Sequence, residues 1–193
     1  AMLVHPNEGS DSIRKWADKG IVGIRLGASS RALTSNPLEH WSSANQLDLV
    51  VSALGSPENF LSQEFSEVLQ LYPNLHIVIE HLAGVESGDT EQLRSFRKVL
   101  ELAQYEQISM KLPGFGEFCA LPYPFKNIPD VADMALEAFS PQRIMWGSDY
   151  PLVTTREGYK NSLEFPMKYF SKLTNEERSW IFGKSAFKLW RFT

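Results

Sequence analysis

Cysteine, long apolar runs and clusters of positive charge are scarce in this sequence. Its 193 residues include one cysteine, Cys119, which excludes an internal disulfide and any metal site built from several thiolates. No apolar run reaches the roughly eighteen residues of a membrane-spanning helix, and no signal-peptide pattern occurs. A formal net charge of -4 argues against a nucleic-acid partner. We therefore expect a soluble, cytoplasmic protein without membrane or nucleic-acid partners.

Several catalytic signatures are also missing. The sequence contains no P-loop, no Cys-x-x-Cys and no His-Glu-x-x-His. Ser148 lacks the Gly-x-Ser-x-Gly context of a nucleophilic serine. The turn after the apolar stretch 21–26 reads Gly27-Ala28-Ser29-Ser30, without the Gly-x-Gly-x-x-Gly pattern of a dinucleotide site. These absences argue against nucleotide-binding enzymes and against serine hydrolases of the elbow type.

The sequence does contain a regular alternation of strand-like and helix-like segments. With 43% hydrophobic residues it can bury a sizeable core, and no linker divides it, so we expect a single domain over residues 1–193. Amphipathic segments with capping residues predict the helices. Six short apolar segments predict strands: Met2–His5, Ile21–Leu26, Asp48–Leu54, Leu75–Glu80, Ile108–Leu112 and Ile144–Trp146.

This alternation predicts an α/β fold with a parallel sheet and right-handed crossovers. Two architectures fit, an open doubly wound sheet and a (β/α)8 TIM-type barrel. The missing glycine-rich phosphate turn favours the barrel. Because a complete barrel has eight strands and roughly 250 residues, this chain is two strand–helix units short of one.

In both architectures ligands meet the C-terminal ends of the strands, so polar residues at those ends are the candidates for chemistry. Asp149 follows the strand Ile144–Trp146 and could serve as a base, a metal ligand or the cap of the next helix. His81 follows the strand Leu75–Glu80. A neutral imidazole there could bind a divalent metal, transfer a proton or simply bond a neighbouring loop.

Four further residues are candidates for binding a substrate. Arg25 lies in an apolar strand, and its guanidinium needs an anion, either a substrate carboxylate or an acidic side chain of a neighbouring strand. Lys111 could bind an anion or extend to solvent. His5 has the right position for a pocket residue, and Tyr150, next to Asp149, is included with them.

Five segments together match the pattern of a known family. The chain resembles the amidohydrolase-related proteins, which include sugar lactonases, pyrone-dicarboxylate lactonase and carboxymuconate-semialdehyde decarboxylases. The resemblance covers nearly all 193 residues, and its most specific parts are the His-Leu-Ala-Gly and Gly-Ser-Asp-Tyr-Pro sequences. The matching segments are Gly23–Leu26, Ile77–Gly84, Met110–Gly114, Met145–Pro151 and Ile181–Trp190.

The resemblance implies a distorted TIM barrel whose last strand carries Asp149 as general base or metal ligand, with His81 as histidine ligand or proton donor. Both residues would then be catalytic, and both would be metal ligands. Arg25 resembles an arginine that some relatives direct at an anionic substrate. One divalent metal ion is implied as the cofactor, zinc before other metals, although certain lactonases of the group work without metal.

The sequence departs from this pattern at its start. Relatives carry a His-x-His pair on the first strand, where alternation places both ligands on one face, and no such pair occurs here. By the alignment Met2–His5 corresponds to about the third strand. We therefore expect a fragment of a longer chain that lacks about the first two β/α units. Ser185 stands where many relatives have Asn. Unpaired strand edges favour association, so a homo-oligomer is among the expected forms.

The main prediction is a hydrolase for a small carboxylated or lactone substrate. Asp149 would take a proton from water while Arg25, Lys111 or a metal polarises the carbonyl. A decarboxylase using the same Asp149 and His81 is the nearest alternative. A catalytically inactive barrel fragment serving as a binding or subunit module is the rival, because those two residues alone make a poor metal site. The aromatic-rich loop Pro113–Lys126 is predicted to wall the pocket.

Overall fold

The structure, a computed structural model, describes residues 1–86 and 88–191. All of the predicted strands are present in it. One parallel sheet contains β1 (Met2–Leu3), β2 (Gly23–Gly27), β3 (Val50–Leu54), β4 (Ile77–Ile79), β5 (Ile108–Leu112) and β6 (Ile144–Trp146). The helices are α1 (Ser10–Ala17), α2 (Glu39–Gln46), α3 (Pro57–Phe60), α4 (Gln63–Leu71), α5 (Thr90–Val99), α6 (Val131–Phe139), α7 (Tyr159–Tyr169), α8 (Asn175–Ser179) and α9 (Ser185–Trp190).

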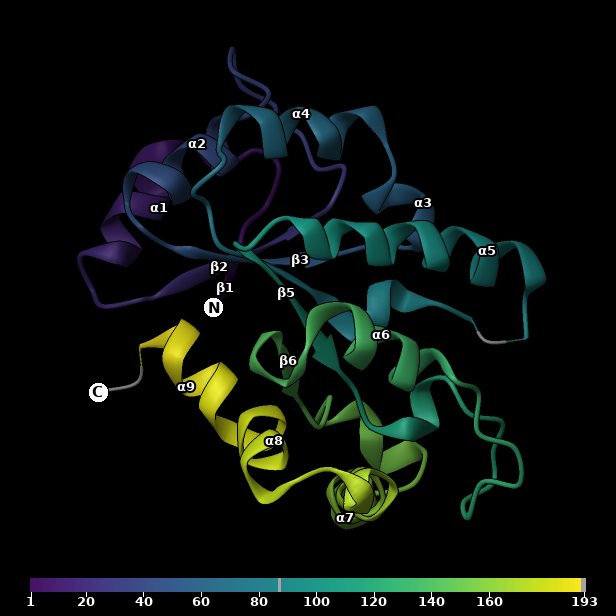
Figure 1. Cartoon of the computed structure of the whole chain (residues 1–193). Coiled ribbons are helices and arrows are strands. Elements are labelled where there is room, and N and C mark those ends of the chain that lie inside the picture. Colours follow the sequence, from purple (N-terminus) through teal and green to yellow (C-terminus); the bar gives the residue numbers. More distant parts are fainter. Residues whose placement is uncertain (87, 192–193) are drawn as a thin grey trace.

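The order of the strands identifies the architecture. Each strand pairs in parallel with the next one along the chain, so the sheet order is β1-β2-β3-β4-β5-β6 (Figure 1). A doubly wound sheet reverses its order at a switch point, whereas a (β/α) barrel keeps it. The protein therefore contains six successive strand–helix units of a TIM-type barrel, as predicted. Among the described residues β1 and β6 do not pair with each other, so the sheet is not closed.

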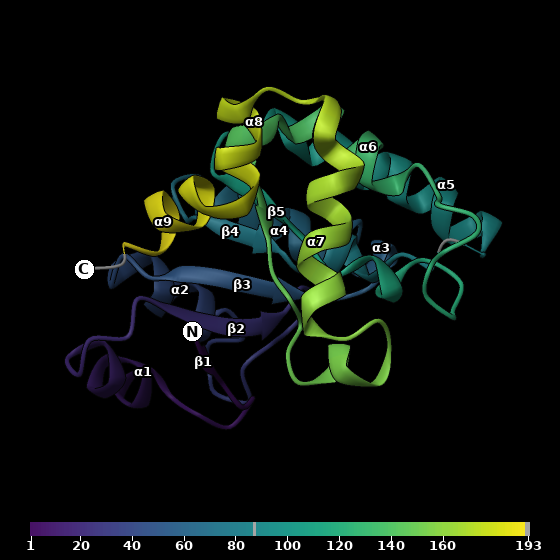
Figure 2. The same cartoon turned by 90° about the horizontal axis from the view of Figure 1, so that it is seen from below.

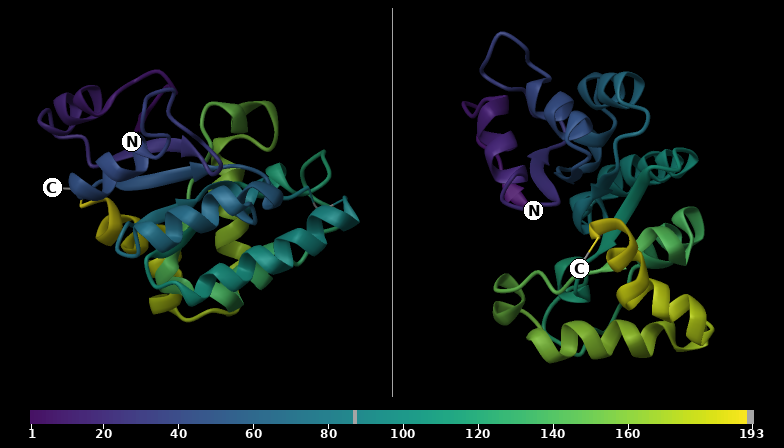
Figure 3. Two further views of the ribbon diagram at one scale, coloured as in Figure 1. Left: turned by 90° about the horizontal axis from the view of Figure 1, so that it is seen from above. Right: turned by 90° about the vertical axis from the view of Figure 1, so that its left-hand side faces the viewer.

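Helices α1 to α6 lie along the outer side of the curved sheet (Figures 1 and 3). Alternate strand residues point toward them, because side chains along a strand alternate between the two faces. Ile24, Val51 and Ile77 are fully buried in this outer layer. They share the main core with helical residues such as Phe65 and Phe96. None of the described helices has both the length and the apolar character needed to cross a membrane.

The inner face of the sheet carries the remaining strand side chains. At the N-terminal ends of the strands α9 packs against this face (Figure 2), where Leu189 and Trp190 contact a cluster of Val50, Val78 and Met145. Polar and charged side chains occupy the rest of the inner face: Arg25, Ser52, Glu80 and Lys111. The sheet thus has an apolar inner layer at one end and a charged layer toward the other.

The aromatic side chains of the loop between β5 and α6 pack into the core. Phe115, Phe118 and Phe125 are buried, and Phe115 and Phe125 stack edge-on against Phe165 of α7. Their burial in the main core explains why they do not line the inner cavity. These aromatic residues therefore do not wall the cavity, although Glu117 of the same predicted pocket loop lies with His81 and Asp149 at the strand ends.

Substitution of Gly23 in β2 tests how closely α9 packs against the sheet. A Cβ on Gly23 would lie 2.5 Å from Trp190 Cζ3 and 2.6 Å from the Val50 carbonyl oxygen. Since that oxygen belongs to the neighbouring strand, Gly23→Ala should lower the free energy of unfolding by roughly 1–3 kcal/mol in urea denaturation. Gly183→Ala is the control, because a Cβ there meets no atom within 4 Å. Equal stability of Gly23→Ala and the unaltered protein would contradict this packing.

Candidate active site

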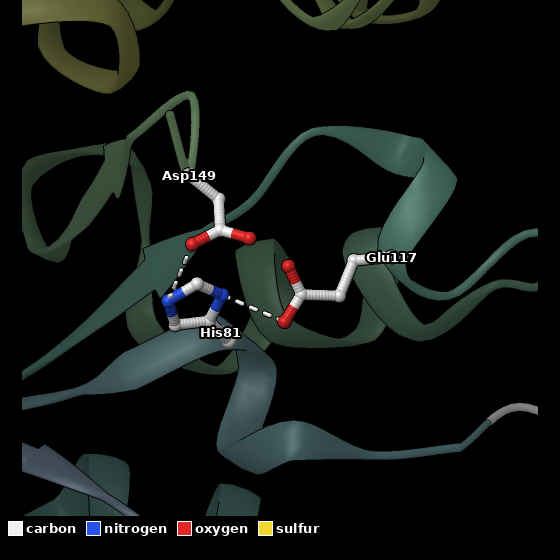
Figure 4. A group of neighbouring side chains, drawn as sticks. All are labelled: His81, Glu117 and Asp149. Carbon is white, nitrogen blue, oxygen red and sulfur yellow. Dashed lines mark ion pairs between the residues drawn. The ribbon is translucent and has the colours of Figure 1, made fainter. Parts of the chain in front are cut away.

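Three side chains converge at the C-terminal ends of β4, β5 and β6 (Figure 4). His81 Nδ1 lies 2.7 Å from Glu117 Oε1, and His81 Nε2 lies 3.7 Å from Asp149 Oδ1. His81 is buried, while the other two side chains keep partial contact with solvent. One donor atom from each of the three lies within 4.8 Å of the others. The predicted pair of His81 and Asp149 is therefore joined by a third residue, Glu117.

The backbone around this cluster adopts conformations that side chains rarely allow. After β4 the chain makes a left-handed turn, with φ of 50° at His81, 51° at Leu82 and 58° at Ala83. Asp149 also has a positive φ, of 56°. Each such residue costs roughly 1–2 kcal/mol relative to a right-handed conformation. Backbone strain of this kind concentrates at functional sites, where it fixes the direction of a side chain.

Arg156, from the segment between β6 and α7, connects the two carboxylates. Its two terminal nitrogens donate to different partners: Nη1 lies 3.1 Å from Glu117 Oε2, and Nη2 lies 3.1 Å from Asp149 Oδ2. Hydrogen bonds between ionised groups are among the strongest in proteins. The guanidinium therefore joins the loop after β5 to the loop after β6.

A second buried carboxylate, Glu80, lies on the other side of His81. Its Oε2 accepts a hydrogen bond from Lys111 Nζ at 2.7 Å and lies 3.1 Å from His81 Nε2. Ser52 donates to the other oxygen, and Arg25 is 3.9 Å away. Burial alone would raise the pKa of Glu80, but His81, Lys111 and Ser52 outweigh it and lower that pKa to about 2.

The carboxylates also control the protonation of His81. Burial of the ring opposes a positive charge, but Glu117 and Glu80 outweigh this effect and raise the pKa of His81 to about 9. Burial likewise favours a protonated Glu117, while His81 and Arg156 act against it and lower the pKa of Glu117 below its usual range. Without a bound metal the histidine is therefore an imidazolium at neutral pH.

A cavity of about 380 Å³ lies on the inner side of the sheet; Glu80, which contacts His81, is in its wall, whereas the cluster of His81, Glu117 and Asp149 is not. Arg25, Glu80 and Lys111 line its polar side, and Met145 and Trp146 contribute apolar surface. This volume falls in the range of small-molecule sites, which are roughly 300–1,000 Å³. The site consequently combines a charged cluster with a partly apolar pocket.

Four of the six predicted site residues lie at the site, and the other two lie outside it. His81 and Asp149 come together, and Arg25 and Lys111 both contact Glu80. His5 is exposed after β1 and belongs neither to the cluster nor to the cavity walls. Tyr150 is 69% exposed and stacks edge-on against Tyr159, so it lies on the surface beside Asp149.

Sequence reasoning missed Glu117 and Arg156. Glu117 is the one acidic residue in the predicted pocket loop, Pro113–Lys126. Arg156 follows Asp149 by seven residues, and a short turn at Leu152–Thr155 brings it back to the site. The position of Glu117 after a parallel strand was a usable signal, whereas no sequence pattern marks Arg156.

Comparison with known proteins identifies the family. Residues 1–192 match the family model described as Amidohydrolase. The chain belongs to the amidohydrolase family. It is 29% identical over 121 residues to an L-fucono-1,5-lactonase of Burkholderia multivorans, which covers 57% of this chain and 41% of that protein. It is also 29% identical over 75 residues to a 4-sulfomuconolactone hydrolase of Rhizobium radiobacter, 39% of this chain and 25% of that protein. The matched segments thus span less than half of either relative.

Solved structures share the fold of this amidohydrolase. A crystal structure of an amidohydrolase from Burkholderia multivorans with bound HEPES has a TM-score of 0.81 at 20% identity, covering 98% of this chain and 72% of that one. A crystal structure with bound zinc, also of an amidohydrolase from that species, has a TM-score of 0.79 at 20% identity, covering 95% and 69%. A probable 2-pyrone-4,6-dicarboxylic acid hydrolase from Acinetobacter baumannii has a TM-score of 0.75 at 20% identity, covering 98% and 72%.

The cluster fits a divalent metal ion. His81 Nδ1 is buried and lies 2.7 Å from Glu117 Oε1 without a well-formed hydrogen bond, so this nitrogen could bind an ion once it loses its proton. One imidazole and two carboxylates form a donor set that such ions accept, and three protein ligands leave a further position open. His81, Glu117 and Asp149 would hold the ion.

The raised pKa of His81 gives a test in the metal-free protein. Because the folded value, about 9, exceeds the ordinary value of 6.5, protonation stabilises the fold below pH 6.5, and this contribution is lost as the pH rises through 9. Glu117→Gln removes the partner that raises the pKa most and should lower it, as followed by NMR titration of the ring. Glu91→Gln, at an exposed ion pair with Arg94, is the control. A His81 pKa below 7 in the unaltered protein would contradict the charge balance.

Proposed function

We propose that this amidohydrolase hydrolyses a small carboxylated lactone, with Asp149 as general base and His81 as its partner. The observation that carries the proposal is the approach of Asp149 Oδ1 to His81 Nε2 at 3.7 Å, at the C-terminal ends of two barrel strands. That separation is too wide for a direct hydrogen bond, so both atoms remain available to a water or a reacting group placed beside them. The lactone-hydrolysing relatives support the reaction class.

The chain's own residues can carry the protons of this reaction. Arg156 holds Asp149 Oδ2, so Oδ1 can accept a proton from the attacking water. The water oxygen then bonds to the lactone carbonyl carbon, and the ring carbon–oxygen bond breaks. In the metal-free protein the His81 imidazolium can donate its proton to the departing ring oxygen. A divalent metal at the cluster, zinc before other metals, would supply polarisation of the carbonyl oxygen.

Arg25 is the better placed of the two predicted substrate cations. Lys111 Nζ is already engaged by Glu80 at 2.7 Å, whereas Arg25 approaches the same oxygen only to 3.9 Å. Arg25 Nε is buried and makes no hydrogen bond, and 39% of the side chain is exposed. A guanidinium with free donors at the cavity can bind a substrate carboxylate through two parallel hydrogen bonds. Lys111 would then hold Glu80 in place.

The role of Asp149 is tested by Asp149→Asn. Asparagine keeps the shape of the side chain but cannot accept the proton, so kcat for lactone hydrolysis should fall by roughly 10²–10⁴-fold. Acid release from sugar lactones and carboxylated lactones measures it. Asp48→Asn is the control, since Asp48 is exposed and pairs with Arg191. Unchanged turnover of every substrate by Asp149→Asn would refute the mechanism.

The same assay separates the alternatives. Release of carbon dioxide from a carboxylated substrate, without lactone hydrolysis, would favour the decarboxylase. No turnover by the unaltered protein, with retained binding of a carboxylated lactone, would favour the inactive binding module.

Arg25→Ala tests the anion anchor. If Arg25 binds the substrate carboxylate in the ground state and the transition state alike, KM should rise by roughly 10–100-fold with little change in kcat. A neutral lactone of the same ring size should show no such rise, and Arg14→Ala on the outer helix α1 is the matched control. An equal effect on neutral and carboxylated lactones would contradict this assignment.

A further inference from the structure

Arg156 belongs to the loop after β6 and contacts a carboxylate of that loop and a carboxylate of the loop after β5. Glu117 follows β5 and Asp149 follows β6, and the Arg156 guanidinium donates a hydrogen bond to each of the two carboxylates. We propose that Arg156 is a positioning residue that holds Glu117 and Asp149 as one unit and so prepares them, with His81, to bind a divalent cation. The part concerning the cation rests on the proposed function, whereas the positioning itself does not.

The guanidinium binds one oxygen of each carboxylate and leaves the other oxygen free of it. It takes Oε2 of Glu117 and Oδ2 of Asp149, each at 3.1 Å. The other oxygen of each, Oε1 and Oδ1, is the one that faces His81. Each carboxylate therefore presents one oxygen toward the histidine and is prevented from turning both toward it. Because the fork of an arginine is planar and rigid, it sets the spacing of the two carboxylates as well as their charge balance.

Arg156 is itself supported from behind by the next residue. Arg156 Nε lies 3.7 Å from Oε2 of Glu157, whose side chain is fully buried. The backbone N–H of Gly116 donates to the other oxygen of Glu157 at 3.1 Å. A Cβ on Gly114 or on Gly116 would collide with the Glu157 carboxylate. The two loops therefore contact each other twice, once through Arg156 and Glu117 and once through Glu157 and Gly116.

Two physical effects of Arg156 on cation binding have opposite signs. A guanidinium beside the site repels a dication, so its removal would tighten binding if charge were decisive. A residue that orients metal ligands acts the other way, since losing such a partner typically weakens metal affinity by about 10–100-fold. The positioning role predicts the second result, and the direction of the change therefore decides between them.

Zinc titration of the full chain by calorimetry measures this direction. Arg156→Ala should weaken zinc binding by about 10–100-fold. Arg156→Lys, which keeps the charge, should also weaken it, because an ammonium cannot span both carboxylates in the same geometry. Arg94→Ala, at an exposed arginine on α5, is the control and should bind zinc as the unaltered protein does. Unchanged or tighter binding by Arg156→Ala or by Arg156→Lys would overturn the proposal.

A second measurement tests the positioning without any metal. In the unaltered protein, proton–nitrogen NMR should resolve the Nη hydrogens of Arg156, because both ends of the fork are held. Glu117→Gln and Asp149→Asn should each shift or broaden a different Nη signal, while Glu91→Gln leaves both unchanged. A spectrum that responds to one carboxylate alone would overturn the proposal. If the unaltered protein binds no zinc but shows both responses, the metal assignment fails and the positioning role stands.

The support by Glu157 gives a variant outside the cation ligands. Gly116→Ala should displace Glu157 and broaden the Arg156 Nη signals, although Glu117 and Asp149 are unaltered. Gly183→Ala, where a Cβ has open space, is the control. Sharp, unshifted Nη signals in a folded Gly116→Ala variant would show that Arg156 does not depend on this support.

Discussion

The site depends on the balance between carboxylates and cations buried at the C-terminal ends of β4, β5 and β6. Carboxylates placed this close repel one another, and burial makes each uncompensated charge costly. Once His81 is protonated, the number of cationic groups in contact with these carboxylates equals the number of carboxylates. The acidic members are Glu80, Glu117, Asp149 and Glu157, and the cationic members are Arg25, His81, Lys111 and Arg156.

The barrel units supply the positions that this balance needs. A parallel sheet with consecutive strand order brings every C-terminal strand end to one edge, so residues far apart in the sequence meet there. His81 and Asp149 arrive directly from β4 and β6, on backbone with positive φ. Glu117 and Arg156 arrive from the following loops, and their mutual contact fixes those loops. The positions of the site residues therefore depend on contacts between loops as much as on the sheet.

The strands and the main pair of site residues could be predicted because they follow local rules. Apolar periodicity predicted all of the strands, the first acidic residue after the last strand indicated Asp149, and the position at the end of a strand indicated His81. The burial of Phe115 and Phe125 could not be predicted, because it depends on the path of α7, which is remote in sequence. The role of Arg156 could not be predicted for a similar reason, because it depends on the turn that follows β6. His5 fits the local rule, yet it joins neither the cluster nor the cavity.

We expect a carboxylated lactone to bind with its carboxylate at Arg25 and its ring carbonyl facing His81 and Asp149. A crystal structure of the Asp149→Asn protein soaked with such a lactone tests this most directly. We expect density in the inner cavity, with the substrate carboxylate on Arg25 and the carbonyl carbon facing residue 149. A lactone held without contact to Arg25 and His81 would contradict it.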